Sequence, residues 1–147
     1  MIRFFVPGVP APGGSKKAFR SPSGRIVVMD DCKRNKPWRD SVASFALEAM
    51  VGKTPLEGPL RVSMYFMLPR PRHHFRTGKK AGQLKDTAPY YHTSKPDATK
   101  LVRSTEDAMT GIVWRDDAVI AQQEIDKTYE SGRGTGVIIE VRRLELV

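Results

Sequence analysis

The segment Leu60–Leu68 constrains the fold of this chain more than any other, because its side chains alternate with a period of two. That period places one set of side chains on each face of a β-strand, so one face of a sheet must be buried. Pro69 and Pro71 end the strand, since proline cannot donate a hydrogen bond to a neighbouring strand. A sheet with one apolar face needs helices or a second sheet to cover it.

The rest of the chain supplies two helices and further strands. Apolar residues recur at helical spacing from Pro37 to about residue 50, and Gly52 ends that helix. A second helix is predicted from residue 97 or 98 to residue 110, with Gly111 in the usual place of a terminating glycine. Strands are predicted over 2–6, 24–29, 118–129 and 137–146, and a Pro- and Gly-rich loop over 7–17. This order indicates a small single α+β domain over 1–147, with a mixed β-sheet and two main helices packed on one side.

Charge and composition narrow the functional classes. The chain has 147 residues and a net charge of +9, which favours an anionic polymer such as nucleic acid as partner. No apolar run approaches the roughly 20 residues of a membrane span, so we expect a cytoplasmic protein that does not enter the membrane. Cys32 is the only cysteine, which excludes an internal disulfide and a zinc site built from several cysteines.

The stretch 70–93 is predicted to be a long basic loop with room for a short hairpin, because it is rich in Arg and Lys and poor in aliphatic residues. Arg70, Arg72 and Arg76 are its candidate phosphate contacts. Lys16 and Lys17, which follow a pair of glycines, could also grip a phosphate backbone. A solvated charge pair is the alternative interpretation of these two lysines.

Three aspartates in a basic part of the chain are candidate catalytic residues. Asp97 precedes the second predicted helix, and Asp116 and Asp117 precede the next strand. Carboxylates are preferred ligands of Mg²⁺, which stabilises charge on the attacking and leaving oxygens during phosphodiester cleavage. Simpler roles are also open: Asp97 could cap the helix, and Asp116 and Asp117 could form a turn.

The acidic and basic residues together form a longer pattern. Lys95-Pro96-Asp97-x-x-Lys100-Leu101-x-Arg103, then Asp107-Ala108-x-x-Gly111, then Asp116-Asp117-Ala118-x-Ile120 resembles the core of the RusA-type endodeoxyribonucleases, which are common on phages and prophages. The resemblance is close over about 30 residues and looser elsewhere. It implies symmetric nicking of four-way DNA junctions (Holliday junctions) in recombination and repair, by a homodimer that uses Mg²⁺. Mn²⁺ could substitute at a site with fewer negative ligands, because it suits mixed ligand sets. A phage- or prophage-encoded protein of a bacterial cell is the implied origin.

The resemblance assigns roles by position. Asp97 and Asp117 match the catalytic aspartates and would bind the metal together with Asp116, while Arg103 matches a basic residue that aids phosphate chemistry. Including the residues named above, the candidate DNA contacts are Lys16, Lys17, Arg70, Arg72, Arg76, Lys95, Lys100 and Lys127.

Three points qualify the assignment. The family commonly has a second aspartate two residues after the first, and this chain has Thr99 there, so a catalytically weakened protein that binds branched DNA is the alternative. A helix over 98–110 is about 20 Å long, so Asp117 returns to Asp97 of its own chain only if residues 111–117 run straight back; otherwise a dimer partner completes the site. Helix spacing also predicts ordinary ion pairs of Glu106 and Asp107 with Arg103, with Asp107 as a possible auxiliary acid.

Overall fold

The sheet is built around β4 (Leu60–Leu68), the strand that alternates most clearly in the sequence. In the computed structural model, β4 pairs in parallel with β5 (Ile120–Tyr129) and antiparallel with β6 (Gly136–Arg143). β6 pairs antiparallel with β1 (Ile2–Pro7), which gives a mixed sheet of order β1-β6-β4-β5. The structure describes all residues except 14–15, 31–32 and 146–147, and the side chains of 16–17 and 28–30 are also left out of the description.

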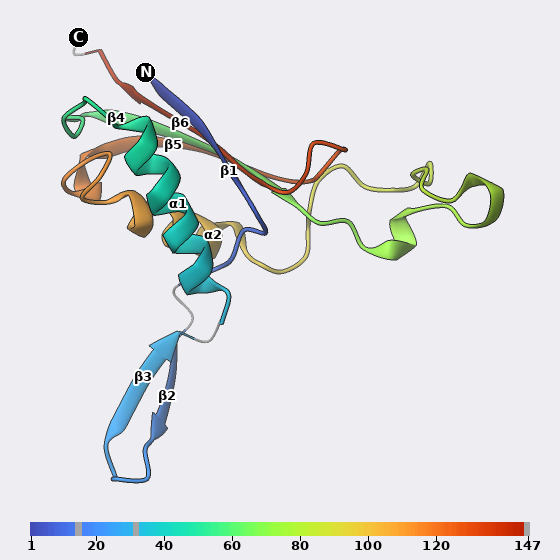
Figure 1. The fold of residues 1–147 in the computed structure, drawn as a ribbon, viewed down its shortest axis with the longest axis horizontal. Coiled ribbons are helices and arrows are strands. Elements are labelled where there is room, and N and C mark those ends of the chain that lie inside the picture. Colours follow the sequence, from blue (N-terminus) through green and yellow to red (C-terminus); the bar gives the residue numbers. More distant parts are fainter. Residues whose placement is uncertain (14–15, 31–32, 146–147) are drawn as a thin grey trace.

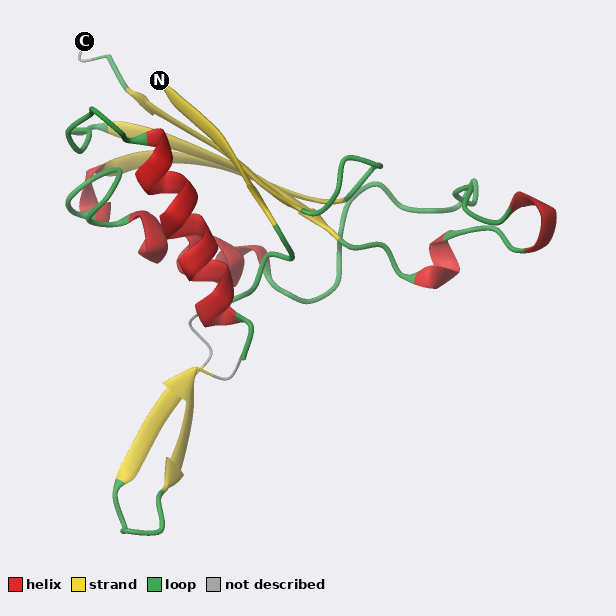
Figure 2. Ribbon diagram, viewed as in Figure 1, coloured by secondary structure: helices red, strands yellow, loops and turns green. Residues whose placement is uncertain are grey.

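Two α-helices, α1 (Asn35–Ala49) and α2 (Ala98–Met109), lie on the same side of this sheet (Figures 1 and 2). Alternate residues of β4 form the buried face: Leu60, Val62, Met64, Phe66 and Leu68 are at most 1% exposed. Trp38 of α1 ties the helices together, because its indole Nε1 donates a hydrogen bond to Thr105 Oγ1 of α2 at 3.1 Å. The prediction of a small α+β domain with two helices packed on a mixed sheet is confirmed.

Several boundaries differ from the prediction. α1 begins at Asn35, before Pro37, because proline is tolerated in the first turn of a helix, where no intrahelical donor is needed. The strand predicted from residue 118 begins at Ile120, since a short 3₁₀ helix, η3 (Asp117–Val119), comes first. The last strand ends at Arg143 rather than residue 146. Gly111 follows α2 with a φ of 89°, a conformation that favours glycine, in the turn that Ile112 N closes on Met109 O at 3.0 Å.

A hairpin projects from the sheet and helices (Figure 1). It consists of β2 (Lys16–Arg20) and β3 (Ile26–Asp30), paired antiparallel. The predicted loop over 7–17 is wrong at its end, because β2 already starts at Lys16. The sequence pattern misses β2 because the hairpin pairs only with itself, outside the four-stranded sheet, so burial imposes little alternation on it.

A second projection, which we call the arm, comprises residues 69–93 and extends away from the helices (Figures 1 and 2). It contains two single-turn 3₁₀ helices, η1 (Arg72–His74) and η2 (Gly78–Lys80). An isolated antiparallel bridge joins Phe75 to Leu84, as expected for a long loop with a short hairpin inside it.

Candidate active site

Asp97 occupies the N-cap position of α2, yet its side chain does not cap the helix: the structure gives it no side-chain cap hydrogen bond. The Asp97 side chain is 61% exposed, and its Oδ2 lies 4.0 Å from Lys100 Nζ. A capping role therefore does not account for this carboxylate. Its position at the positive end of a helix dipole suits an anion that must stay ionised.

Lys127 of β5 holds the segment that leads into Asp97. Its Nζ donates hydrogen bonds to the backbone carbonyls of Ser94 at 2.7 Å and Pro96 at 2.8 Å. Burial lowers the pKa of Lys127, and the nearby Asp97 carboxylate opposes that shift. Lys127 therefore contacts the backbone that leads into Asp97.

The two aspartates before β5 differ in their roles. Asp116 Oδ1 accepts a hydrogen bond from Ala118 N at 2.9 Å, so Asp116 caps η3 and matches the turn interpretation. Asp117 is the first residue of η3 and is exposed. Asp117 is therefore the more available carboxylate of the pair.

Glu106 of α2 lies near Asp117, and the sequence predicts only an ordinary ion pair for it. Its Oε2 accepts a hydrogen bond from Gln123 Nε2 of β5 at 2.6 Å, and among the described residues no ion pair joins it to Arg103. Burial, followed by the nearby Asp117 carboxylate, raises the pKa of Glu106, whereas the Gln123 hydrogen bond lowers it. Because Gln123 is distant in sequence, helix spacing alone could not reveal this partner.

Two hydrogen bonds fix the direction of α2. Lys127, near the end of β5, bonds Pro96 just before the helix starts, and Gln123, earlier in β5, bonds Glu106 near the end of the helix. α2 therefore runs antiparallel to β5. The helix has 12 residues, about 18 Å at 1.5 Å per residue, with Arg103 exposed midway.

The length of α2 keeps the predicted carboxylates apart. Asp97 is at one end of the helix, and Asp117 lies beside Glu106 near the other. Throughout the described part of the chain, no group of three His, Cys, Asp or Glu residues is placed to hold a metal ion. One chain therefore does not bring the predicted ligands Asp97, Asp116 and Asp117 into one site.

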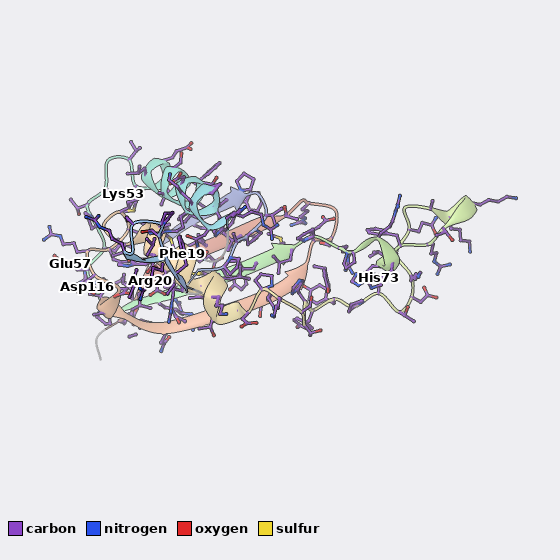
Figure 3. All side chains as sticks on the ribbon, turned by 90° about the horizontal axis from the view of Figure 1, so that it is seen from below. Phe19, Arg20, Lys53, Glu57, His73 and Asp116 are labelled. Atoms are coloured by element: carbon purple, nitrogen blue, oxygen red, sulfur yellow. The ribbon has the colours of Figure 1, made fainter. Side chains whose placement is uncertain are left out.

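The predicted DNA contacts on the arm fall into two kinds. Arg70 is used internally: its Nε donates to Glu130 O at 3.2 Å and its Nη1 to Pro89 O at 2.8 Å. Arg76 pairs with Asp86 at 2.9 Å, whereas Arg72 is exposed. Figure 3 shows His73, next to Arg72, far from Asp116 along the long axis of the molecule.

The remaining predicted DNA contacts are on the main body and the hairpin. Lys95 is exposed and Lys100 is partly exposed, both beside Asp97. The backbones of Lys16 and Lys17 belong to β2, but their side chains lie outside the described part of the structure.

The root of the arm is fixed to the end of β5 by an aromatic cluster. The Tyr129 ring contacts His74 and His92, with centroids 4.7 and 4.8 Å away, and Arg70 lies over the same ring at 5.2 Å. Burial is the main cause that lowers the pKa of both His74 and His92. Nothing in the local sequence marks this cluster, because it depends on how the arm folds back onto β5.

Comparison with known proteins identifies the class to which this architecture belongs. Residues 7–142 match the family model of endodeoxyribonuclease RusA, and the chain belongs to that family of DNA-cleaving enzymes. The chain is also similar to the uncharacterized protein YqaN of Bacillus subtilis (strain 168). The two sequences are 25% identical over 139 residues, which cover 94% of this chain and 94% of YqaN. In the described residues, no helix is both long and apolar enough to cross a membrane.

Proposed function

We propose that this chain is a Mg²⁺-dependent endodeoxyribonuclease that resolves four-way DNA junctions by paired nicks, acting as a homodimer. Membership of the RusA family supports DNA cleavage. The observation that carries the proposal is the pair of exposed carboxylates, Asp97 and Asp117, on a chain of net charge +9. A carboxylate repels the DNA phosphates that the neighbouring lysines and arginines would bind. A divalent cation bound between carboxylate and phosphate removes this repulsion.

The separation of the two carboxylates supports a site shared between two chains. A two-fold dimer contact is self-complementary, so it can place two copies of α2 side by side in opposite directions. Asp97 of one chain would then face the partner's Asp117 and the partner's Glu106, and the same would hold at the other end. Such a dimer has two equivalent centres, as two symmetric incisions require.

The side chains in this arrangement suit Mg²⁺, which prefers carboxylate and water oxygens. Asp97 of one chain together with Asp117 and Glu106 of the partner subunit would hold the ion. When bound, Mg²⁺ supplies stabilisation of the charge that develops on the attacking and leaving oxygens. Lys100 and Arg103, both on α2, would neutralise the phosphate group next to the scissile bond.

The two projections would extend the DNA contact beyond this centre. The arm carries Lys79, Lys80 and Lys85, all exposed, and the hairpin carries Arg20 and Arg25, also exposed. Phosphate contacts made by such residues bind DNA without regard to base sequence. Recognition would then depend on the shape of the branched DNA. A dimer has two arms and two hairpins, which could contact several branches of the junction.

A second candidate is a protein that binds branched DNA but cleaves it weakly. Thr99 favours it, because threonine cannot supply the negative charge that the family's usual second aspartate brings. The Thr99 side chain is exposed in the first turn of α2, close to Asp97 in sequence. Glu106 is the carboxylate that could compensate for this loss at the shared site.

A nicking assay separates these candidates. Wild type and Asp97→Asn are incubated with a synthetic four-way junction, with Mg²⁺, with Mn²⁺ and without metal, and binding is measured alongside by gel shift. Asp40→Asn is the matched control, since Asp40 is an exposed acid on α1 that pairs with Lys36. We expect paired nicks from wild type and the control, and junction binding without nicks from Asp97→Asn. Tight binding by wild type without nicks in either metal would favour the second candidate.

A further inference from the structure

Lys127 is partly buried, and its ammonium group is bonded within the protein, as expected for a structural anchor rather than a surface DNA contact. It lies on β5 opposite Phe66 of β4, on the face of the sheet that the helices cover. Two of the three N–H donors of its ammonium group are used at the carbonyls of Ser94 and Pro96, at 2.7 and 2.8 Å. The accepting residues lie three and one positions before Asp97 in the chain.

The rest of the segment around Asp97 is held from other directions. On the helix side, Leu101 N donates to Asp97 O at 3.1 Å and begins the hydrogen bonding of α2. On the arm side, His92 N donates to Lys127 O at 3.0 Å, and Tyr129 N to Tyr90 O at 3.0 Å. The turn between the arm and α2 is bridged by the Lys127 side chain.

We propose that Lys127 is a positioning residue, whose ammonium group fixes residues 94–96 so that the Asp97 carboxylate points outward from the start of α2. This inference rests on the proposed nuclease function, in which Asp97 is a metal ligand. Removing the ammonium group leaves two carbonyls without their donor, so the turn shifts and Asp97 moves with it. A misplacement of about 1 Å at a reacting group can cost about a hundredfold in rate.

The experiment compares Lys127→Met, which keeps the length of the side chain but donates no hydrogen bond, with Lys127→Arg, which keeps donors and charge. Cleavage rate at saturating junction, junction Kd and the salt dependence of Kd are measured for each. We expect Lys127→Met to slow cleavage at least tenfold with Kd and salt slope unchanged, and Lys127→Arg to recover part of the rate. Arg39→Met, which removes an exposed cation from α1, is the control for charge loss.

A phosphate contact would give the opposite result. Kd for Lys127→Met would then weaken and the salt slope would fall by about 0.9, while the rate at saturating DNA stayed at the wild-type value. That outcome would overturn the positioning role. Equal rates for wild type and Lys127→Met with unchanged Kd would overturn it as well.

A measurement on the wild-type protein keeps the inference testable if Lys127→Met does not fold or if the wild type has no nuclease activity. An ammonium group bonded to two carbonyls exchanges its protons slowly, so we expect a ¹H–¹⁵N signal from Lys127 Nζ near neutral pH. Fast exchange at Lys127, as for an exposed lysine such as Lys53, would contradict the anchor. Because this signal needs neither metal nor DNA, its loss is distinguishable from failure of the proposed function.

Discussion

Neutralising the exposed cations of the arm should weaken junction binding and flatten its dependence on salt. The variant replaces the arm cations that the structure leaves exposed, and it spares Arg70 and Arg76, whose side chains bond within the protein. The substitutions are Arg72→Gln, Lys79→Gln, Lys80→Gln and Lys85→Gln.

The expected size follows from counterion release. Each phosphate contact contributes about 0.9 to the slope of log affinity against log salt, so losing four contacts lowers the slope by up to about 3.6. When salt rises from 50 to 200 mM, the affinity of the variant should therefore fall by a factor about 150 times smaller than the affinity of the wild type. The arm would then supply a large share of the binding free energy at low salt.

Fluorescence anisotropy with a labelled four-way junction, titrated at several salt concentrations, measures this slope directly. The matched control removes the same number of exposed cations outside the arm and the hairpin, at Arg39, Lys53, Arg142 and Arg143. We expect the control to change the slope by less than about 1. An arm variant with the wild-type slope, or one that changes no more than the control, would refute the arm as a DNA contact.

Two further predictions follow from single sites. Thr99→Asp should lower the metal concentration that gives half-maximal cleavage, because added ligand charge strengthens binding of hard cations; an unchanged metal dependence would show that the site is already complete. Burial lowers the pKa of both His74 and His92, so the unfolded chain binds more protons below their usual pKa of 6.5. Stability should therefore fall as the pH drops below 6.5, and His74→Phe with His92→Phe should flatten that loss in thermal unfolding. His73→Gln, at the exposed histidine beside His74, should remove only the smaller part of that loss, because burial lowers the pKa of His74 more than the charge of His73 does.

The main body of the fold could be predicted from sequence because its elements share one core. The alternation of Leu60–Leu68 requires one buried face, and the structure buries that face under both helices. The hairpin could not be predicted as fully, since β2 and β3 pair with each other outside the four-stranded sheet, and the sequence of β2 does not alternate.

The candidate site was only partly predictable for a related reason. Asp97 and Asp117 stand out because carboxylates are unusual in a basic segment. The partners of Lys127 and Glu106 depend on how α2 lies along β5, which local spacing does not encode. The length of the predicted helix limited how closely Asp117 could approach Asp97 of the same chain. The sequence could not decide whether one chain or two chains form the site.

Mixing two inactive variants tests the shared site most directly. Asp97→Asn and Asp117→Asn chains are co-folded into heterodimers, isolated with two affinity tags, and assayed on a four-way junction with Mg²⁺. If each centre combines Asp97 of one chain with the partner's Asp117, the heterodimer has one intact centre and one that lacks both carboxylates. We expect single nicks from the heterodimer and none from either parent homodimer. A heterodimer that binds the junction but makes no nick, while wild type nicks it, would contradict the shared site.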